Sequence, residues 1–197
     1  MDAERRGLID ANPQAAIDST GLEATVRSAH YACRRRDGNR RYRYRKFPKL
    51  TLVCHTSSHL IAAALATVGP GYDAPLFPEA LLKASWNLEI DRLLAGGGYD
   101  SEPNHQMARE GLGIRSTVIN LNRRRTRRWP QQRFRRQMRK CFHRRKYRQR
   151  WQVESVISRL KRRLGSALRG RSDGARERES YMKVLTHNLM ILAGSTS

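Results

Sequence analysis

The stretch YRQRWQVESVISRLK, residues 147–161, carries the clearest structural signal in the chain. Its apolar side chains, followed by one more leucine, recur at the spacing of one helical face: Val153, Val156, Ile157, Leu160 and Leu164. We therefore expect helical structure between Arg144 and Leu168, with one side of the helix buried in a core.

Four polar side chains fall next to that apolar stripe: Tyr147, Arg150, Glu154 and Lys161. At about 100° per residue they share an arc of roughly 60°, so this edge of the helix should face a groove at the margin of the core. From geometry alone, Glu154 has two equally weighted roles. It is either a structural ion-pair partner of an arginine or a metal ligand surrounded by groups that hold phosphates.

The charge balance points to a polyanionic partner. The chain has 40 Lys and Arg against 17 Asp and Glu, a net charge of +23, and Glu154 is the sole acidic residue between Asn120 and Arg171. Most of these cations are arginines, whose planar guanidinium can bind two phosphate oxygens at once. Nucleic acid is the favoured partner. A merely solvated basic face fits less well, because such faces usually mix both signs.

A second basic stretch, Arg34 to Lys46, alternates arginine with tyrosine. It suits an arm that grips a nucleic-acid backbone and stacks on bases, and it suits a plain cationic loop equally well.

The remaining pattern alternates strands and helices. Five strands are expected at 14–20, 50–54, 60–68, 90–95 and 116–119, and three further helices at 79–88, 102–110 and 176–192. This order predicts an α/β layer fold.

The length fits a single domain, residues 1–197, with a basic insertion at about 120–145 ahead of the Glu154 helix. No window approaches 18 consecutive apolar residues, and the N-terminus lacks the apolar stretch of a signal peptide. We expect a cytoplasmic protein without a membrane partner, associated with the nucleoid if it binds DNA.

The spacing of Tyr147, Arg150, Glu154 and Lys161 resembles the signature of a large branch of DDE insertion-sequence transposases. Further segments resemble that family in the same order, from about Ala15 to Leu192: IDSTG around Asp18, GPGYD at 69–73, GGGYDSEPNH at 96–105 and LTHNLMIL at 185–192.

The resemblance implies an RNase H-like fold, a mixed sheet flanked by helices. It implies that Asp18 and Glu154 are the first and third carboxylate ligands of Mg²⁺ or Mn²⁺. The expected activity is DNA strand cleavage and strand transfer by in-line phosphoryl displacement. Arg150 and Lys161 would hold DNA phosphates, and Tyr147 would pack against the strand end.

One position departs from the family pattern. Gly96 stands where the family has its second aspartate, so metal binding should be weakened and cleavage reduced or lost. Asp100 is the nearest substitute, but it lies in a loop beyond the glycines. The alternative function is a catalytically dead, DNA-binding remnant; an RNA-binding protein of ribosomal type would explain the charge but not the ordered motifs.

Only 17 residues precede Asp18, whereas family members usually carry a DNA-binding region there. We therefore expect an N-terminally truncated catalytic domain. Its expected partners are DNA at the element ends and the target, and a homodimer on DNA is compatible with the resemblance.

Overall fold

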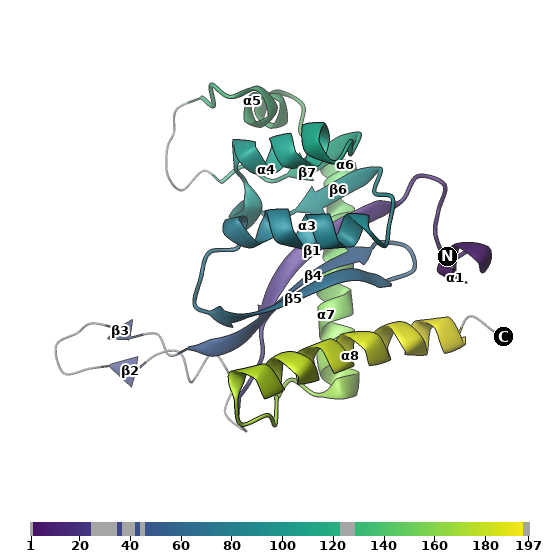
Figure 1. Cartoon of the computed structure of the whole chain (residues 1–197). Coiled ribbons are helices and arrows are strands. Elements are labelled where there is room, and N and C mark those ends of the chain that lie inside the picture. The colour runs from purple at the N-terminus through teal and green to yellow at the C-terminus, as the bar shows by residue number, and fades with distance from the viewer. Residues whose placement is uncertain (1, 25–34, 37–41, 44–45, 123–128, 195–197) are drawn as a thin grey trace.

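The computed structural model describes residues 2–24, 35–36, 42–43, 46–122 and 129–194. A five-stranded mixed sheet forms its centre, in the order β5-β4-β1-β6-β7 (Figure 1). The strands are β1 (Gln14–Gly21), β4 (Phe47–His55), β5 (Ile61–Gly69), β6 (Arg92–Ala95) and β7 (Ser116–Ile119). β4 is antiparallel to both neighbours, while β1, β6 and β7 are parallel. The expected α/β mixed sheet is confirmed.

A short two-stranded ribbon, β2 (Arg35–Arg36) and β3 (Tyr42–Arg43), falls within the basic stretch from Arg34 to Lys46. Most of that stretch lies outside the described residues.

Helices flank the sheet (Figure 1). They are α1 (Asp2–Arg5), α3 (Phe77–Ser85), α4 (Glu102–Gln106), α5 (Arg133–Lys140), α6 (Arg144–Tyr147), α7 (Trp151–Leu164) and α8 (Asp173–Gly194). A π-helical turn, Met107–Gly111, continues α4. No helix among these described segments is long and apolar enough to span a membrane.

Each face of the sheet has its own core, because successive strand residues point to opposite sides. Ala15 and Ile17 of β1 pack with α3 and the turn that continues α4. Ala16, between them, packs on the other side with the α7 residues Val153 and Val156. α8 also contacts this second side of the sheet, at β4 and β5.

The expected helix from Arg144 to Leu168 is divided in the structure. α6 is followed by a tighter 3₁₀ turn, Arg148–Arg150, and α7 then ends at Leu164. Gly165 stops the helix because its φ of 83° lies in the left-handed region that favours glycine. The division leaves Arg150 one turn before Glu154, as expected.

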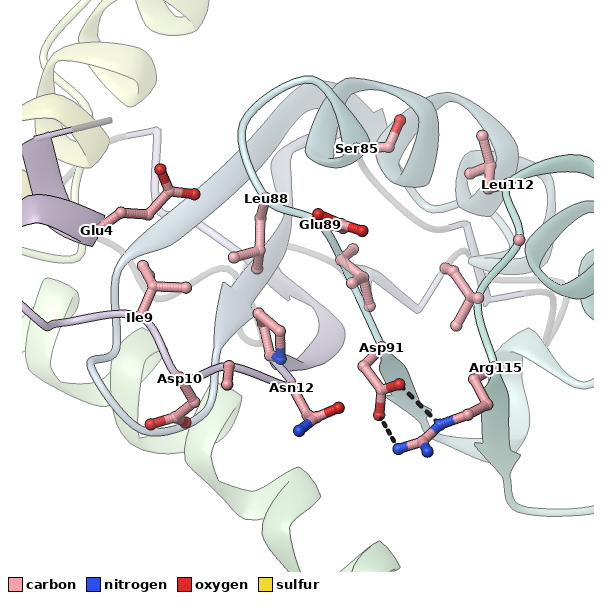
Figure 2. A pocket seen from close by; sticks show the side chains of 15 residues that line it. Glu4, Ile9, Asp10, Asn12, Ser85, Leu88, Glu89, Asp91, Leu112 and Arg115 are labelled. Carbon is pink, nitrogen blue, oxygen red and sulfur yellow. Dashed lines mark hydrogen bonds and ion pairs between the residues drawn. The ribbon is translucent and has the colours of Figure 1, made fainter.

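The amino ends of β1, β6 and β7 border a hollow of about 640 Å³ (Figure 2). Its charged lining is largely acidic: Glu4, Asp10, Glu89 and Asp91, the last paired with Arg115 at 2.8 Å. Such a surface repels phosphate, so it does not favour DNA binding at this end of the sheet. The carboxyl ends of the parallel strands carry the expected site.

Candidate active site

Asp18 and Gly96 lie side by side where the pairing between the parallel strands β1 and β6 ends. The register pairs Ile17 of β1 with Ala95 of β6, so each site residue directly follows a paired position. Ala16 and Leu94, two residues earlier in each strand, belong to the core on the α7 side. Because side chains alternate along a strand, positions 18 and 96 face α7 as well.

Gly96 has room for a side chain directed at Arg150. A β-carbon added there would meet Arg150 Nη1 at 4.0 Å and no other atom at or within that distance. The backbone, with φ −70° and ψ 165°, is extended and open to any residue. The position therefore offers both the space and the direction for a carboxylate, and glycine supplies none.

Arg150 joins the two expected carboxylates. Its Nη1 donates to Asp18 Oδ2 at 3.2 Å, and its Nη2 donates to Glu154 Oε1 one helical turn later. The structure thus brings Asp18, Arg150 and Glu154 together from β1 and the start of α7. Burial raises the pKa of Asp18 above its ordinary value, against the opposing effects of the Ser19 amide and Arg150.

A partly buried hydrogen-bond network centred on Ser19 adjoins Asp18. The Ser19 amide donates to Asp18 Oδ1 at 2.9 Å, and the Ser19 hydroxyl bonds Tyr99 Oη at 2.7 Å and Thr51 Oγ1 at 2.8 Å. Tyr99 is 1% exposed and follows the glycines that end β6. The network therefore fixes the segment around Gly96 relative to β1.

Lys161 lies beside the same site. Its Nζ donates to the carbonyl oxygen of Gly21 at 2.9 Å, at the end of β1. Lys161 and Arg162 line a shallow depression of about 390 Å³ together with Asp18 and Glu154. A depression bordered by carboxylates and cations suits a phosphodiester with a bound cation.

Tyr147 stands at the margin of this group. Its ring packs against Phe142 with centroids 5.0 Å apart, and the Arg150 guanidinium carbon lies 5.9 Å from its centroid. Tyr147, Arg150 and Glu154 are thus linked in turn along the helix, while Lys161 contacts β1 instead.

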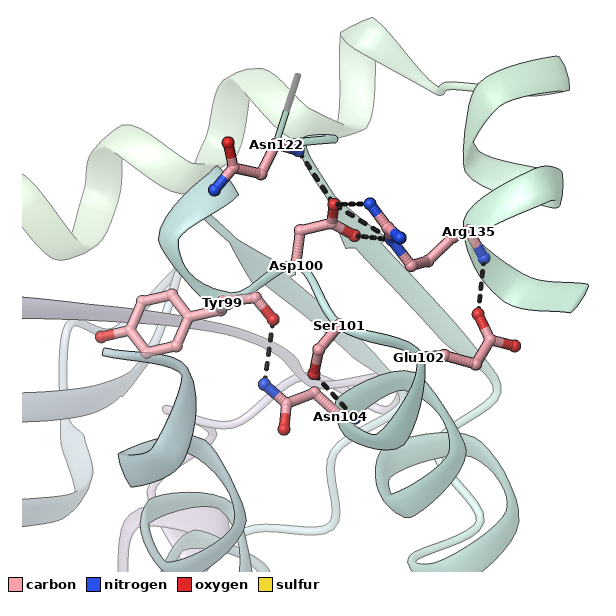
Figure 3. Close-up of polar contacts among 7 residues, drawn as sticks. All are labelled: Tyr99, Asp100, Ser101, Glu102, Asn104, Asn122 and Arg135. Carbon is pink, nitrogen blue, oxygen red and sulfur yellow. Dashed lines mark hydrogen bonds and ion pairs between the residues drawn. The ribbon is translucent and has the colours of Figure 1, made fainter. Parts of the chain in front are cut away.

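Asp100 is held elsewhere (Figure 3). Its carboxylate, fully buried, accepts three hydrogen bonds from the Arg135 guanidinium, at 2.9 to 3.2 Å, and one from the Asn122 amide at 2.9 Å. These donors satisfy both of its oxygens. The arrangement favours a structural role for Asp100 over that of substitute ligand.

A carboxylate that sequence reasoning missed, Asp73, lies close enough to raise the pKa of Asp18, though less than burial does. It belongs to the GPGYD turn that the resemblance singled out. Its Oδ1 is paired with Lys49 Nζ at 2.6 Å, and the same ammonium donates to the carbonyl oxygen of Gly71. Asp73 thus anchors the turn to β4.

The donor chemistry at Asp18 and Glu154 fits a hard divalent cation, because carboxylate oxygens are what Mg²⁺ and Mn²⁺ prefer. Within the described ranges, however, no group of three or more His, Cys, Asp or Glu side chains is placed to hold a metal. Asp18 and Glu154 are two carboxylates where the resemblance implied three, and position 96, where it implied an aspartate, is glycine.

The sheet order, its flanking helices and a late-helix glutamate beside a first-strand aspartate define an RNase H-like α/β domain. Comparison with protein families adds that the family described as "Transposase DDE domain" matches residues 11–189, and the chain belongs to it. A comparison with curated proteins gave no match. Membership in this family implies DNA as the substrate.

Proposed function

We propose that this chain is a transposase domain for metal-dependent DNA strand cleavage and strand transfer, with that activity reduced or lost because position 96 is glycine. The family supports the transposase function. The observation that carries the finer proposal is the open position at Gly96, beside Asp18, where an added β-carbon would lie 4.0 Å from Arg150 Nη1.

Asp18 and Glu154 are the residues that would hold Mg²⁺ or Mn²⁺. When bound, the cations would activate the attacking oxygen and stabilise the leaving oxygen of the phosphodiester. The protein's own part is to hold the DNA: Lys161 borders the depression, where its charge can bind a phosphate near the reacting bond.

Two carboxylates would leave a pair of bound divalent cations under-neutralised. Two divalent cations a few ångströms apart repel each other strongly unless anionic ligands lie between and beside them. Asp18 and Glu154 can offset part of this repulsion. A third carboxylate at position 96 would offset more of it. Metal affinity and cleavage should therefore both be low in this chain, while DNA binding by the arginines persists.

The second candidate function is a DNA-binding remnant without catalysis. The high positive charge around α5 and α7 supports it, since phosphate binding by these arginines does not need the metal. The two functions differ in what a carboxylate at position 96 does.

The test is a DNA-nicking assay with Mg²⁺ or Mn²⁺ on the original chain, Gly96→Asp, Gly96→Asn and Gly96→Asp with Glu154→Gln. Gly96→Asn is the matched control, because it fills the same space without a charge. We expect cutting to rise by at least about tenfold in Gly96→Asp alone and to vanish again when Glu154 is replaced.

DNA binding by each variant is measured in parallel by fluorescence anisotropy. A folded, DNA-bound Gly96→Asp protein that stays inert would favour the remnant. Equal cutting by Gly96→Asn and Gly96→Asp would show that the carboxylate is not the missing group.

A further inference from the structure

The Arg150 guanidinium lies between the carboxylates of Asp18 and Glu154, where a metal cation would otherwise bind. It contacts Asp18 through Nη1 and Glu154 through Nη2. The Arg150 side chain is 21% exposed, and that of Glu154 is 52% exposed. This bridge of Asp18, Arg150 and Glu154 therefore lies at the protein surface, where DNA can reach it.

This bridge conflicts with both ligands that the proposed function requires. A divalent cation bound by Asp18 and Glu154 would stand within a few ångströms of the guanidinium, and like charges at that range repel. A phosphate gripped by Nη1 and Nη2 would need the same pair of donors that now serve the carboxylates. Arg150 can neutralise the carboxylates or bind DNA with this edge, but not both.

We propose that Arg150 couples DNA binding to metal binding at this site. In the free protein it acts as an internal counter-cation for Asp18 and Glu154. A DNA phosphate draws it away and leaves the carboxylates available to the metal. This inference rests on the proposed metal site, and the coupling is reciprocal: whatever factor DNA adds to metal affinity, metal adds to DNA affinity.

The general field of the protein is the competing explanation. A net charge of +23 disfavours any cation, and DNA relieves that field wherever it binds. Arg162 provides the matched control, because it lines the same depression, is exposed, and makes no ion pair with Asp18 or Glu154 in the structure. Removing Arg162 lowers the local field but leaves the bridge in place.

The experiment measures metal binding by the cleavage of the polypeptide that a bound metal ion directs. Fe²⁺ is added in place of Mg²⁺, with ascorbate and peroxide, so that hydroxyl radicals cut the polypeptide near a bound ion, and fragments ending near residues 18 and 154 are quantified. Five proteins are compared with and without a short DNA duplex: the full chain, Arg150→Met, Arg150→Lys, Arg162→Met and Gly96→Asp. Excess Mn²⁺ tests whether the iron competes for the same site.

For the original chain and for Arg162→Met, DNA should increase these fragments by at least about fivefold. Arg150→Met should give strong cutting without DNA and little further increase with it. Arg150→Lys keeps a cation near the pair and should retain part of the DNA dependence, and circular dichroism checks that each variant is folded.

Two failures are distinguishable. Fragments that appear but respond to DNA equally in Arg150→Met and the original chain would overturn the coupling and leave the metal site standing. If no variant, Gly96→Asp included, gives fragments near residues 18 and 154, the metal site is wrong and the coupling falls with it.

Discussion

The buried carboxylate of Glu102 accepts a hydrogen bond from the backbone amide of Phe134, at 2.8 Å, and so ties α4 to the first turn of α5. Its other oxygen accepts from the Arg135 amide at 3.0 Å. A carboxylate at this end of a helix satisfies amides that have no partner within the helix and complements the helix dipole. The strongly basic α5 is therefore anchored by an acidic residue 32 positions before Phe134.

Glu102→Gln should destabilise the fold by about 1–2 kcal/mol, because the amide keeps one acceptor but loses the charge and the second oxygen. Urea unfolding measures the free energy, and amide hydrogen exchange should speed up at the start of α5. Glu110→Gln is the control, since its partner Arg133 is 78% exposed and surface pairs contribute little. Equal effects of the two changes would refute the anchoring role.

Asp100→Asn should cost about 1.5–3 kcal/mol of unfolding free energy, because it weakens buried hydrogen bonds to the charged Arg135. The loss should be the same with and without Mg²⁺, as measured by thermal unfolding. In the Gly96→Asp background, Asp100→Asn should leave cleavage per folded molecule unchanged. Selective loss of cleavage there, without loss of stability, would restore Asp100 as a ligand.

His105 should make the fold sensitive to acid. Burial lowers its pKa to about 4, and its Nδ1 shares a hydrogen bond with Thr117 Oγ1 at 2.8 Å. The unfolded chain binds a proton on this residue near pH 6.5, whereas the folded chain resists it until near pH 4, so stability falls as pH drops through that window. The full loss should be about 3 kcal/mol.

The measurement is the free energy of unfolding at pH 7 and pH 4.5 for the original chain and for His105→Asn. The variant should lose less stability on acidification. His143→Asn, at an exposed histidine, should keep the original pH dependence. An unchanged pH dependence in His105→Asn would assign the acid sensitivity to other groups.

DNA affinity should fall steeply with salt, with a log-log slope near −0.9 for each phosphate neutralised. Replacing Arg136 and Lys140, both exposed on α5, by alanine should make that slope less negative by up to about 2. Lys83→Ala, which removes a cation from α3, should leave it unchanged. Anisotropy titrations at several salt concentrations measure these slopes. Identical slopes for the original chain and the Arg136/Lys140 double variant would show that DNA does not bind at α5.

Strand alternation and helical spacing were enough to predict the sheet and the burial of α7. The positions of Asp18 and Glu154 near each other were also predictable, because a short motif places each on a regular element whose orientation the core fixes. Their role as metal ligands stays a prediction. The family comparison agrees with the sequence resemblance at the level of the transposase domain.

The side-chain contacts that determine the roles of Asp100 and Arg150 were not predictable from the sequence. Nothing in the sequence shows that Asp100 faces Arg135 instead of Asp18, because that depends on how the segment after Gly96 turns away from β6. Nor does it show that Arg150 bridges both carboxylates, since one partner is a helical neighbour and the other lies 132 positions away. Such pairings arise only when distant elements are packed together.

The extended backbone at Gly96 has an evolutionary consequence. A glycine that is required by a left-handed turn cannot be replaced without repairs elsewhere, but this one sits in ordinary geometry with free space before it. Glycine codons ending in a pyrimidine become aspartate codons by a single base change. A copy with this architecture would stand one missense mutation from having a carboxylate at position 96, so selection could add that group without any repair to the backbone.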